Sequence, residues 1–411
     1  MAADRPPLLS LDEALARLVQ GAQQHRIDAV ETVPTFDALG RVLAADVVSA
    51  VDVPPADNSS MDGYALRTAD VPAAGTVLPV VQRIAAGDVG EALAPGSAAR
   101  IFTGAPVPPG ADAIVMQEHC AALGGDGLGA VRVDQVPVPG AWIRRRGEDV
   151  RHGAAVLRAG MRLTPQALGL AAGVGAATLP VRRRPRVALF STGNELVMPG
   201  EPLPPGAIYN SNRFMLRGLL QAAGCETQDL GIVPDRLDAT RDALRRAAAG
   251  ADLILSTGGV SVGEEDHLRP AVQAEGRLEL WQVAIKPGKP LAFGSVGAAL
   301  FIGLPGNPVS SFITFLVAVR PVLAALLGAD AALPAPLPLR AAFDWPRPDR
   351  RREFLRVRLD AAGALELFPN QSSGVLTSTV WADGLVDNPP GQVIRRGDTV
   401  RFLPLTDLVS R

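Results

Sequence analysis

Hydrophobic residues recur at helical spacing close to the start of the chain. Ser10 and Glu13 form the capping-box pattern S-x-x-E, and Ala14 and Leu18 follow on one face of the helix that this pattern predicts. The polar residues between them fall on the opposite face. The sequence therefore predicts a first amphipathic helix that packs against another part of the protein.

A small β module is predicted to follow. Between Val51 and Val138, Pro and Gly separate short runs rich in Val and Ile, which is typical of short strands joined by turns. A second helix is predicted from Thr164-Pro165 to about Gly173, because Thr is a good N-cap and Pro fits the first helical turn. We expect the two helical segments to pack together as one discontinuous domain, residues 1–50 and 145–180, with the β domain 51–144 inserted.

From Val187 the pattern becomes regular. Runs that read as buried strands, such as VALFSTG and LILSTGG, alternate with runs that read as helices, such as NRFMLRGLLQAAG and RLDATRDALRRAAAG. This alternation predicts a mostly parallel sheet with helices on both faces, over residues 181–332. A Pro-rich linker and short alternating runs follow, which predict a C-terminal β domain over residues 333–411. The fold class is thus multidomain α/β plus β.

Two stretches allow more than one interpretation. The segment Arg182 to Arg186 contains four arginines, and we interpret it as a solvated linker rather than a phosphate site. The stretch from Leu291 to Val319 contains no charged residue and is long enough to cross a membrane. Because GLPGNP interrupts it, a buried strand, a loop and a buried helix are favoured over a membrane span.

The amino-acid composition narrows the range of functions that the protein can have. Hydrophobic residues make up 47% of the chain and charged residues 20%, a globular balance, and the net charge of -2 provides no basic field for nucleic acid. Only Cys120 and Cys225 are present, and four scattered histidines show no metal-binding spacing. The N-terminus lacks the basic and apolar pattern of a signal peptide, so a cytoplasmic protein is expected.

Polar, Gly-rich loops follow the predicted strands of the α/β domain. Because parallel strands end at the same edge of a sheet, these loops are expected to share one rim, where glycines and helix N-termini can hold phosphate or another oxyanion. Tight connections are the alternative reading for any single loop. The candidate binding residues in these loops are Ser191, Thr192, Gly193, Ser256, Gly258, Gly259, Ser261, Gly263, Gly306, Asn307 and Ser310.

Charges on this rim have both signs. Glu195, Asp235 and Asp266 are carboxylates at strand ends, and carboxylates beside a phosphate favour a bound Mg²⁺. Lys286 and Lys289 flank the proline-stiffened loop AIKPGKP, which ends at Pro290, and two lysines can hold a doubly charged oxyanion. The alternative is that these are surface charges paired across loops.

A second motif in the same region points to a different chemistry. Gly259 to Gly263 matches the nucleophile-elbow pattern G-x-S-x-G, but a hydrolase triad needs a later histidine. The only later histidine is His267, which is too close in sequence to come from another strand end. Walker and GxGxxG motifs are also absent from the sequence. A serine hydrolase and an ordinary nucleotide site are therefore disfavoured.

Three segments outside the α/β domain are rich in polar residues. They contain Asp57 and Asp62 in DNSSMDGYA, Thr103 in RIFTGA and Asp149 in RRRGEDV. Each segment alone is also compatible with ordinary turn chemistry, because Asn, Asp, Ser and Gly are the usual turn residues.

Together, DNSSMDGYA, RIFTGAPVPPGAD, IRRRGEDV, FSTGNEL, STGGVSVGEED, AIKPGKP and GLPGNPVS resemble the molybdopterin molybdenumtransferase family, which includes the E domain of gephyrin. The motifs follow the family's order over essentially the whole chain. The resemblance implies a helix-containing segment, an inserted β domain, a molybdopterin-binding α/β domain and a C-terminal β-barrel domain. It also implies a homodimer with its active-site cleft between the α/β domain of one subunit and the β domain of the other.

The resemblance implies an activity and roles for single residues. Adenylated molybdopterin and molybdate would react in the presence of Mg²⁺ to give molybdenum cofactor and AMP. Molybdopterin adenylyltransferase and apo-molybdoenzymes are the implied partners. Many bacterial relatives carry Lys where this chain has Gln282. By motif match, the catalytic positions are Asp57, Asp62, Thr103, Asp149, Glu195, Asp235 and Asp266, the molybdate positions are Lys286 and Lys289, and a looser match adds Arg351 or Arg352 and Ser372.

Two other functions remain open from the sequence. A molybdopterin adenylyltransferase shares the α/β domain, although that activity does not need the flanking β domains. A non-catalytic scaffold of the kind that gephyrin provides is the alternative from a different functional class.

Overall fold

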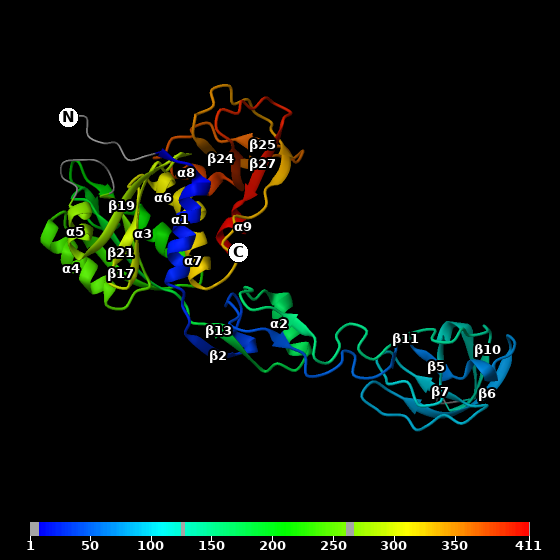
Figure 1. The fold of residues 1–411 in the computed structure, drawn as a ribbon. Helices are drawn as coiled ribbons and strands as arrows, with labels where there is room; N and C mark the ends of the chain where they lie inside the picture. Colours follow the sequence, from blue (N-terminus) through cyan, green and yellow to red (C-terminus); the bar gives the residue numbers. More distant parts are fainter. Residues whose placement is uncertain (1–7, 125–127, 260–266, 411) are drawn as a thin grey trace.

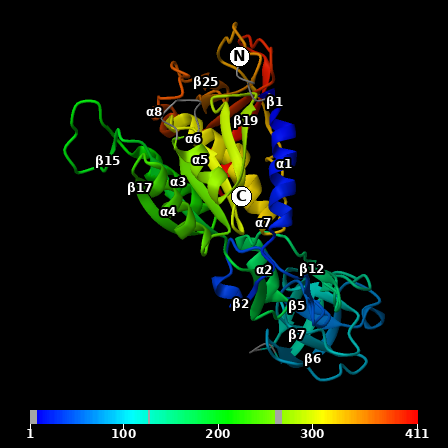
Figure 2. The ribbon, with the colours of Figure 1, turned by 60° about the vertical axis from the view of Figure 1, so that its left-hand side comes forward.

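The protein is an elongated molecule with a large body at one end and a small β domain at the other (Figure 1). The computed structural model describes residues 8–124, 128–259 and 267–410. A narrow connecting region separates the two ends, and the separation persists in a view turned by 60° (Figure 2). The predicted class, multidomain α/β plus β, is confirmed.

A seven-stranded sheet forms the centre of the body, in the order β1-β19-β21-β22-β18-β14-β17. The pairs β1–β19, β22–β18, β18–β14 and β14–β17 are parallel, as predicted. The pairs β19–β21 and β21–β22 are antiparallel, because tight connections leave no room for a crossover helix. The strands are Leu8–Leu9 (β1), Arg186–Thr192 (β14), Glu226–Val233 (β17), Leu253–Thr257 (β18), Gly276–Val283 (β19), Pro290–Val296 (β21) and Ala299–Leu304 (β22).

Helices cover both faces of this sheet. On one face α4 (Leu237–Ala248) and α5 (Leu268–Glu275) bury a core that includes Leu244, Val272 and Phe190. On the other face lie α1 (Leu11–Gln24), α3 (Ser211–Ala222), α6 (Pro308–Thr314), the π-helical turn η4 (Phe315–Val319) and α7 (Arg320–Leu326). Because helices bury both faces of the sheet, side chains on both sides of each strand are hydrophobic, and the strands appear in the sequence as continuous hydrophobic runs.

The first helix belongs to the core of this body. Ser10 caps α1, and its hydroxyl and the Glu13 carboxylate form the predicted capping box. The apolar face of α1 contains Leu11 and Leu18, which are buried in the same core as α7. The strand β1 extends the sheet next to β19. The start of the chain is therefore packed against the α/β domain. The expectation that this helix packs against the helix after Thr164 was wrong, because the apolar residues of that second helix lie in a separate core.

The uncharged stretch of the sequence lies inside the protein. It contains β21, β22 and the continuous helix Pro308–Leu326, which is long and apolar enough to cross a membrane by length and composition. Of the residues that meet this criterion, 89% are buried within the protein. The stretch thus has the strand, loop and buried helix that the sequence favours.

The connecting region consists of short two-stranded sheets and one helix. Strand β2 (Val30–Pro34) pairs with β13 (Thr178–Arg182), and β3 (Val47–Val48) pairs with β12 (Ala155–Leu157). The helix α2 (Pro165–Gly173) starts where predicted, because the Thr164 hydroxyl accepts a hydrogen bond from the Ala167 N–H. Segments from both sides of the inserted domain thus form this region together.

The arginine segment between β13 and β14 is not a solvated linker, so that prediction was wrong. Arg183 binds both carboxylate oxygens of Asp252 at 2.8 and 3.0 Å. Arg184 donates to the Gly224 carbonyl at the end of α3. These half-buried side chains join the connecting region to the α/β domain, because a guanidinium can satisfy several buried carbonyl and carboxylate groups at once.

The inserted β domain has a six-stranded sheet in the order β8-β5-β7-β6-β10-β9, with a separate pair β4–β11 at its base. Its short turns η2 (Thr68–Asp70) and η3 (Gln117–His119) connect strands. The strands are Asn58–Ser59 (β4), Gly63–Leu66 (β5), Thr76–Ile84 (β6), Ala98–Ile101 (β7), Ala113–Met116 (β8), Cys120–Leu123 (β9), Gly129–Val133 (β10) and Ile143–Arg144 (β11).

The C-terminal domain continues from the body without a gap. Strand β20 (Ile285–Lys286) leaves the α/β domain and pairs in parallel with β24 (Arg352–Leu359) of the C-terminal sheet. Phe354 and Leu385 also enter the α/β core. The remaining elements are β23 (Leu337–Arg340), β25 (Leu365–Leu367), α8 (Thr377–Trp381), β26 (Gly384–Asn388), β27 (Thr399–Pro404) and α9 (Leu405–Ser410).

Candidate active site

The carboxyl ends of β14, β18 and β22 meet at one edge of the α/β sheet. Ser191 lies opposite Thr257, and Thr257 lies opposite Leu304 in the parallel ladders. The loops after these strands therefore begin side by side, at the edge where open α/β sheets bind ligands. The helices α3 and α6 begin at the same edge, at Ser211 and Pro308.

A pocket of about 540 Å³ opens at this edge. Its wall includes the starts of two helices, where backbone N–H groups favour a bound anion. The segment β15 (Leu196–Val197) to β16 (Ile208–Tyr209), which projects from the body in Figure 2, supplies another wall. The lining residues are Thr192, Glu195, Leu196, Ile208, Tyr209, Asn210, Ser211, Asn212, Thr257, Gly258, Gly306, Asn307, Pro308 and Gly374.

Two asparagines of this pocket have hydrogen-bonding capacity that the described protein does not use. The side-chain oxygen Oδ1 of Asn210 accepts from the Arg213 N–H at 3.2 Å, which caps α3 and leaves the Asn210 Nδ2 without a partner among the described residues. The Asn212 Nδ2 donates to the Gly306 carbonyl at 2.7 Å and to Thr257 at 2.9 Å, which leaves Asn212 Oδ1 without a partner. Because these contacts fix both amide orientations, the pair presents one unused donor and one unused acceptor.

Two serines lie beneath the same rim. Ser191 is fully buried and directs its hydroxyl toward Asn210 Oδ1 at 3.4 Å. Ser256 is also fully buried, and its hydroxyl has no hydrogen-bond partner among the described residues. An unpaired buried polar group costs free energy, of the order of 1–3 kcal/mol. In the pocket lining itself, the unpaired groups of Asn210 and Asn212 favour a polar ligand that completes them, whereas Ser256 lies outside that lining.

Gly258 permits the close approach of two of the loops. Its φ angle is +90°, a conformation that residues with a side chain rarely adopt. A Cβ atom at this position would lie 2.4 Å from the Thr192 carbonyl oxygen. The loop after β18 therefore requires glycine here, for its backbone conformation and for its packing against the end of β14.

The rim also carries acidic side chains. Glu195 lines the pocket, and Asp235 approaches the Thr192 hydroxyl at 3.4 Å. Carboxylate and hydroxyl oxygens are ligands that Mg²⁺ accepts, so the chemistry of this donor set fits that ion. Within the described ranges, no group of three or more His, Cys, Asp or Glu side chains is positioned to hold a metal. The third predicted acid, Asp266, lies outside the described residues, as do Ser261 and Gly263.

The other predicted binding residues surround the pocket at varying distance. Gly306 and Asn307 line it, whereas Ser310 is buried within α6 and Pro290 begins β21. Gly193 packs against the Glu195 carboxylate. Gly259 directly follows Gly258 and ends the described part of its loop.

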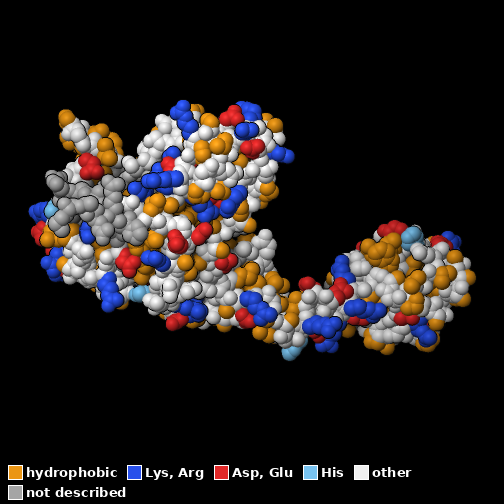
Figure 3. Space-filling view, turned by 45° about the horizontal axis from the view of Figure 1, so that its top comes forward, with side chains coloured by type: hydrophobic (Ala, Val, Ile, Leu, Met, Phe, Trp, Pro, Cys, Tyr) orange, Lys and Arg blue, Asp and Glu red, His pale blue; other side chains and the backbone are white. Residues whose placement is uncertain are grey.

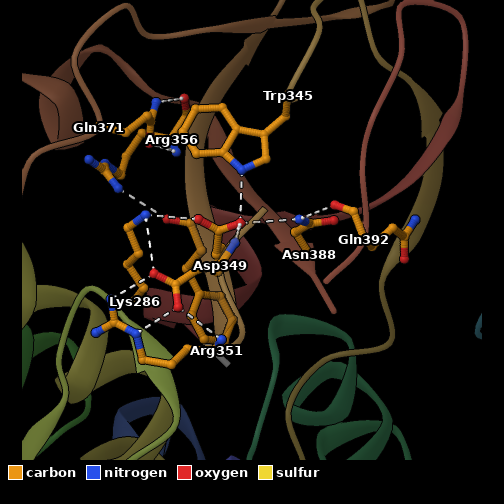
Figure 4. Close-up of polar contacts among 10 residues, drawn as sticks. Lys286, Trp345, Asp349, Arg351, Arg356, Gln371, Asn388 and Gln392 are labelled. Carbon is orange, nitrogen blue, oxygen red and sulfur yellow. Dashed lines mark hydrogen bonds and ion pairs between the residues drawn. The ribbon is translucent and has the colours of Figure 1, made fainter. Parts of the chain in front are cut away.

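Lys286 belongs to a second, smaller pocket of about 250 Å³ between the α/β domain and the C-terminal domain (Figure 4). Its ammonium lies 3.1 Å from Glu353 Oε1 and 3.5 Å from Asp349 Oδ2. Lys289 is half-buried outside this lining, and its ammonium forms no ion pair with any residue in the described ranges. The pocket is lined by Lys286, Pro287, Trp345, Glu353, Leu355, Arg356, Gln371 and Ser372.

Arg356 is the second cation of this pocket, and its side chain is almost fully buried, with 1% exposed. Its guanidinium donates to Ser378, to the Phe354 carbonyl and to the Ser372 carbonyl. Burial lowers the pKa of Arg356 to about 10. No acidic partner of this guanidinium occurs among residues 8–124, 128–259 and 267–410. An arginine buried without a carboxylate favours a bound anion.

Arg356 was missed in the sequence, where the loose family match indicated Arg351 or Arg352. The structure pairs Arg351 with Asp349, and this guanidinium holds the pKa of Asp349 well below its usual range. Arg352 binds Asp387 through two hydrogen bonds. The available signal was the alternation in EFLRV, because an arginine two residues after a buried Phe354 shares its side of the strand.

The acidic residues of the inserted domain are satisfied internally. Asp57 accepts the Arg146 N–H at 2.8 Å and pairs with the Arg145 guanidinium at 2.7 Å, and these contacts lower its pKa. Asp62 accepts both the N–H and the hydroxyl of Thr103 at 2.8 Å, and these two bonds lower its pKa.

Within one chain, this domain does not contribute to either pocket. Asp57, Asp62 and Thr103 lie on the β domain, which stands clear of the α/β body in every view (Figures 1 and 2). Asp149 lies where the chain leaves that domain, with its N–H bound to the Val53 carbonyl. The space-filling view shows the narrow connecting region, with acidic and basic side chains along it, between the two ends (Figure 3).

Comparison with family models covers most of the chain. Residues 9–175 match a model described as MoeA N-terminal region (domain I and II). Residues 188–325 match a model described as probable molybdopterin binding domain. Residues 338–405 match a model described as MoeA C-terminal region (domain IV). The three matches follow the order of the domains in the structure.

Individual proteins give the same result. The chain is 41% identical over 392 residues to molybdopterin molybdenumtransferase 2 of Mycobacterium tuberculosis, covering 91% of this chain and 95% of that protein. It is 34% identical over 406 residues to the molybdopterin molybdenumtransferase of Bacillus subtilis, covering 96% and 94%. The crystal structure of the molybdopterin biosynthesis moeA protein from Pyrococcus horikoshii superposes with a TM-score of 0.82, at 31% identity, covering 96% of this chain and 99% of that chain.

The sequence motifs, the domain order and these full-length matches agree. The chain belongs to the molybdopterin molybdenumtransferase family and is a transferase of molybdenum cofactor biosynthesis.

Proposed function

We propose that this enzyme inserts molybdate into adenylated molybdopterin and releases AMP in a Mg²⁺-dependent reaction. The observation that carries the proposal is that two pockets of different chemistry are bordered by the same segment of the chain. The larger pocket has helix N-termini and unused amide groups, and the smaller one has Lys286 and Arg356. One segment borders both, since Ser372 lines the smaller pocket and Gly374 the larger.

The larger pocket suits the organic substrate. Its volume of about 540 Å³ falls within the usual range for small-molecule sites. The unused donor of Asn210 and the unused acceptor of Asn212 match a flat heterocycle that has a carbonyl next to an N–H group. The starts of α3 and α6 favour the phosphate groups of the same substrate.

The smaller pocket suits molybdate, a compact dianion. Lys286 supplies an ammonium, the Arg356 guanidinium lies behind it, and Ser372 and Gln371 add polar groups. The Val309 N–H donates to the Ser373 carbonyl at 3.0 Å, which fixes the segment between the pockets against the start of α6. In this arrangement Lys286 holds the oxyanion, and Lys289 contributes from outside the lining.

Mg²⁺ is proposed to lie at the rim, bound by Glu195 and Asp235, with Asp266 as a further candidate ligand. The ion would neutralise the phosphoanhydride of the substrate and stabilise charge on the leaving AMP. The enzyme's own side chains then act mainly by positioning. Cleavage of a phosphoanhydride needs orientation and charge neutralisation more than covalent catalysis.

The inserted β domain is proposed to complete the site of a second subunit in a homodimer. Asp57, Asp62 and Thr103 stand away from the pockets of their own chain (Figure 1). The connecting region exposes hydrophobic side chains, including Phe36 at 95% and Leu39 at 55%. A second copy that covers these residues would bring its β domain toward the rim, as the family resemblance implies.

We place the enzyme in the cytoplasm, where it would receive adenylated molybdopterin from molybdopterin adenylyltransferase and deliver the cofactor to apo-molybdoenzymes. The test is incubation of the purified chain with adenylated molybdopterin, molybdate and Mg²⁺, followed by measurement of AMP and molybdenum cofactor. We expect AMP release that requires all three components. Adenylation of molybdopterin with ATP would instead indicate an adenylyltransferase, and no reaction would favour a scaffold.

A second assay addresses the acid outside the described residues. Replacement of Asp266 with Ala is expected to abolish molybdate-dependent AMP release while the fold stays intact. Unchanged turnover in this variant would remove Asp266 from the proposed metal site.

A further inference from the structure

Glu353 is a carboxylate with no exposed surface at the wall of the smaller pocket. Within the described ranges, the four groups that form hydrogen bonds with its carboxylate are all donors. Oε1 accepts from Lys286 Nζ at 3.1 Å. Oε2 accepts from Trp345 Nε1 at 2.8 Å, from the Asp349 N–H at 3.2 Å and from Asn388 Nδ2 at 3.4 Å. Figure 4 shows how these groups converge from the two domains.

The contact between Glu353 and Lys286 also joins two domains. Lys286 ends β20 of the loop AIKPGKP, and its backbone pairs with Glu353 on β24 of the C-terminal domain. The ion pair and the strand ladder thus connect the same two residues. Because the C-terminal domain also supplies Arg356 and Ser372, this connection sets the position of Lys286 relative to the rest of the pocket.

We propose that Glu353 is a positioning residue of the oxyanion pocket, which holds the Lys286 ammonium where it meets the substrate dianion. This inference rests on the proposed function. A lysine side chain has four rotatable bonds and is about one third exposed here, so without an anchor it would spread over many rotamers in solvent.

Asp349 does not replace Glu353 in this role. It lies farther from Lys286, at 3.5 Å, and both of its carboxylate oxygens already accept from the Arg351 guanidinium at 3.0 and 2.8 Å. The centroid of the Trp345 ring lies 5.9 Å from the same ammonium, and the indole N–H of Trp345 donates to Glu353. Glu353 is therefore the neighbour that fixes the ammonium most directly.

The test is the substitution Glu353→Gln in the full-length enzyme. Because these hydrogen-bonding groups are all donors, the new amide NH₂ must face a donor, and the contact with Lys286 or with Trp345 is lost. We expect the KM for molybdate to rise by about tenfold, the loss typical of one charge-assisted hydrogen bond. The KM for adenylated molybdopterin is expected to change by less than about twofold, because the larger pocket is untouched.

Controls separate positioning from a general structural role. Asn388→Ala removes another donor to Glu353 from outside the pocket lining, and it is expected to leave the KM for molybdate within about twofold. Lys286→Met is expected to raise that KM, and Glu353→Gln in the Lys286→Met background is expected to add nothing further. If Glu353→Gln does not fold, Glu353→Asp, which keeps the charge but shortens its reach, is measured against the same two controls.

The outcomes distinguish this inference from the proposed function. A wild-type enzyme without molybdate-dependent turnover overturns the proposed function. An active wild type with an unchanged KM for molybdate in Glu353→Gln overturns the positioning role alone. The positioning role would also be overturned if Glu353→Gln raised the KM for molybdate by the same factor in the Lys286→Met background as in the wild type. Glu353 would then act independently of the lysine. Calorimetric titration of the wild type and each variant with molybdate alone is expected to rank their affinities in the same order as their KM values for molybdate.

Discussion

The rim of the α/β domain and the acidic loops of the inserted β domain differ in how their polar groups are satisfied. At the rim, Asn210 Nδ2, Asn212 Oδ1 and the Ser256 hydroxyl are buried and lack partners among the described residues. In the β domain, Asp62 accepts hydrogen bonds from Thr103, and Asp57 accepts them from Arg145 and Arg146, directly after the last strand of the domain.

This difference indicates two kinds of functional surface. The rim carries an energetic cost that a ligand can relieve, so it is organised to bind a substrate. The acidic side chains of the β domain loops already have hydrogen-bond partners, so this surface is preassembled, and the proposed homodimer would give it a function. The following experiments test this distinction.

The largest effect is expected for Gly258→Ala, because the new Cβ would meet the Thr192 carbonyl at 2.4 Å. We expect kcat/KM to fall by about a hundredfold through displacement of the rim. The matched control is Gly75→Ala in the β domain, where φ is +87° but no atom of the described residues lies within 4 Å of the new Cβ. Steady-state kinetics and thermal unfolding of both variants are the measurements. Equal losses of activity would show that backbone strain alone, and not the close contact, is responsible.

Asn212→Ala is expected to weaken substrate binding at the larger pocket. The substitution removes the unused acceptor and the hydrogen bonds to Gly306 and Thr257. We expect the KM for adenylated molybdopterin to rise by about tenfold and the KM for molybdate to stay nearly constant. Kinetics with each substrate varied in turn would measure this. A rise in the KM for molybdate alone would contradict the assignment of the two pockets.

A mixture of two inactive variants tests whether the two surfaces meet across subunits. Gly258→Ala damages the rim, and Asp62→Ala removes the Thr103 partner in the β domain. If each site uses both chains, mixed dimers contain one intact site, and a fully exchanged equal mixture is expected to regain about a quarter of wild-type activity. Activity after coexpression is the readout. No recovery, with exchange demonstrated, would mean that each site is built within one chain.

The smallest effect is expected for the pH dependence of the β domain. Hydrogen bonds from the N–H and the hydroxyl of Thr103 lower the pKa of Asp62. This contribution to stability is fully present above the unfolded value of about 3.9 and is lost as the pH falls through the lower folded pKa. We expect acid unfolding of the wild type below about pH 4 to be steeper than that of Asp62→Asn. Identical curves would remove Asp62 from the groups that couple stability to pH.

Much of the fold was predictable from local patterns. The capping box at Ser10, the N-cap at Thr164 and the alternating strands and helices after Val187 depend on residues close in sequence, so the pattern determined them. The uncharged helix at Pro308 was also recognisable, because the motif before it separates it from the preceding strands. These features need no knowledge of how distant segments pack.

The candidate site was predictable only in part. Gly-rich loops after the strands marked the rim, since parallel strands end at one edge. Arg356 and the unused groups of Asn210 and Asn212 were not visible, because their importance lies in burial and in missing partners. The arginines near Arg184 seemed exposed in the sequence, yet their carbonyl and carboxylate partners come from distant segments.

The sequence by itself determined the family, the domain order and the candidate side chains that lie in its motifs, because motifs are short and local. Only the tertiary structure decided which of them share a pocket. It placed Lys286 beside Glu353 and Arg356, and it kept Asp57 and Asp62 away from the rim of their own chain. The reason is physical: ion pairs and pockets depend on distances of a few ångströms between segments that lie tens of residues apart, and local patterns do not encode those distances.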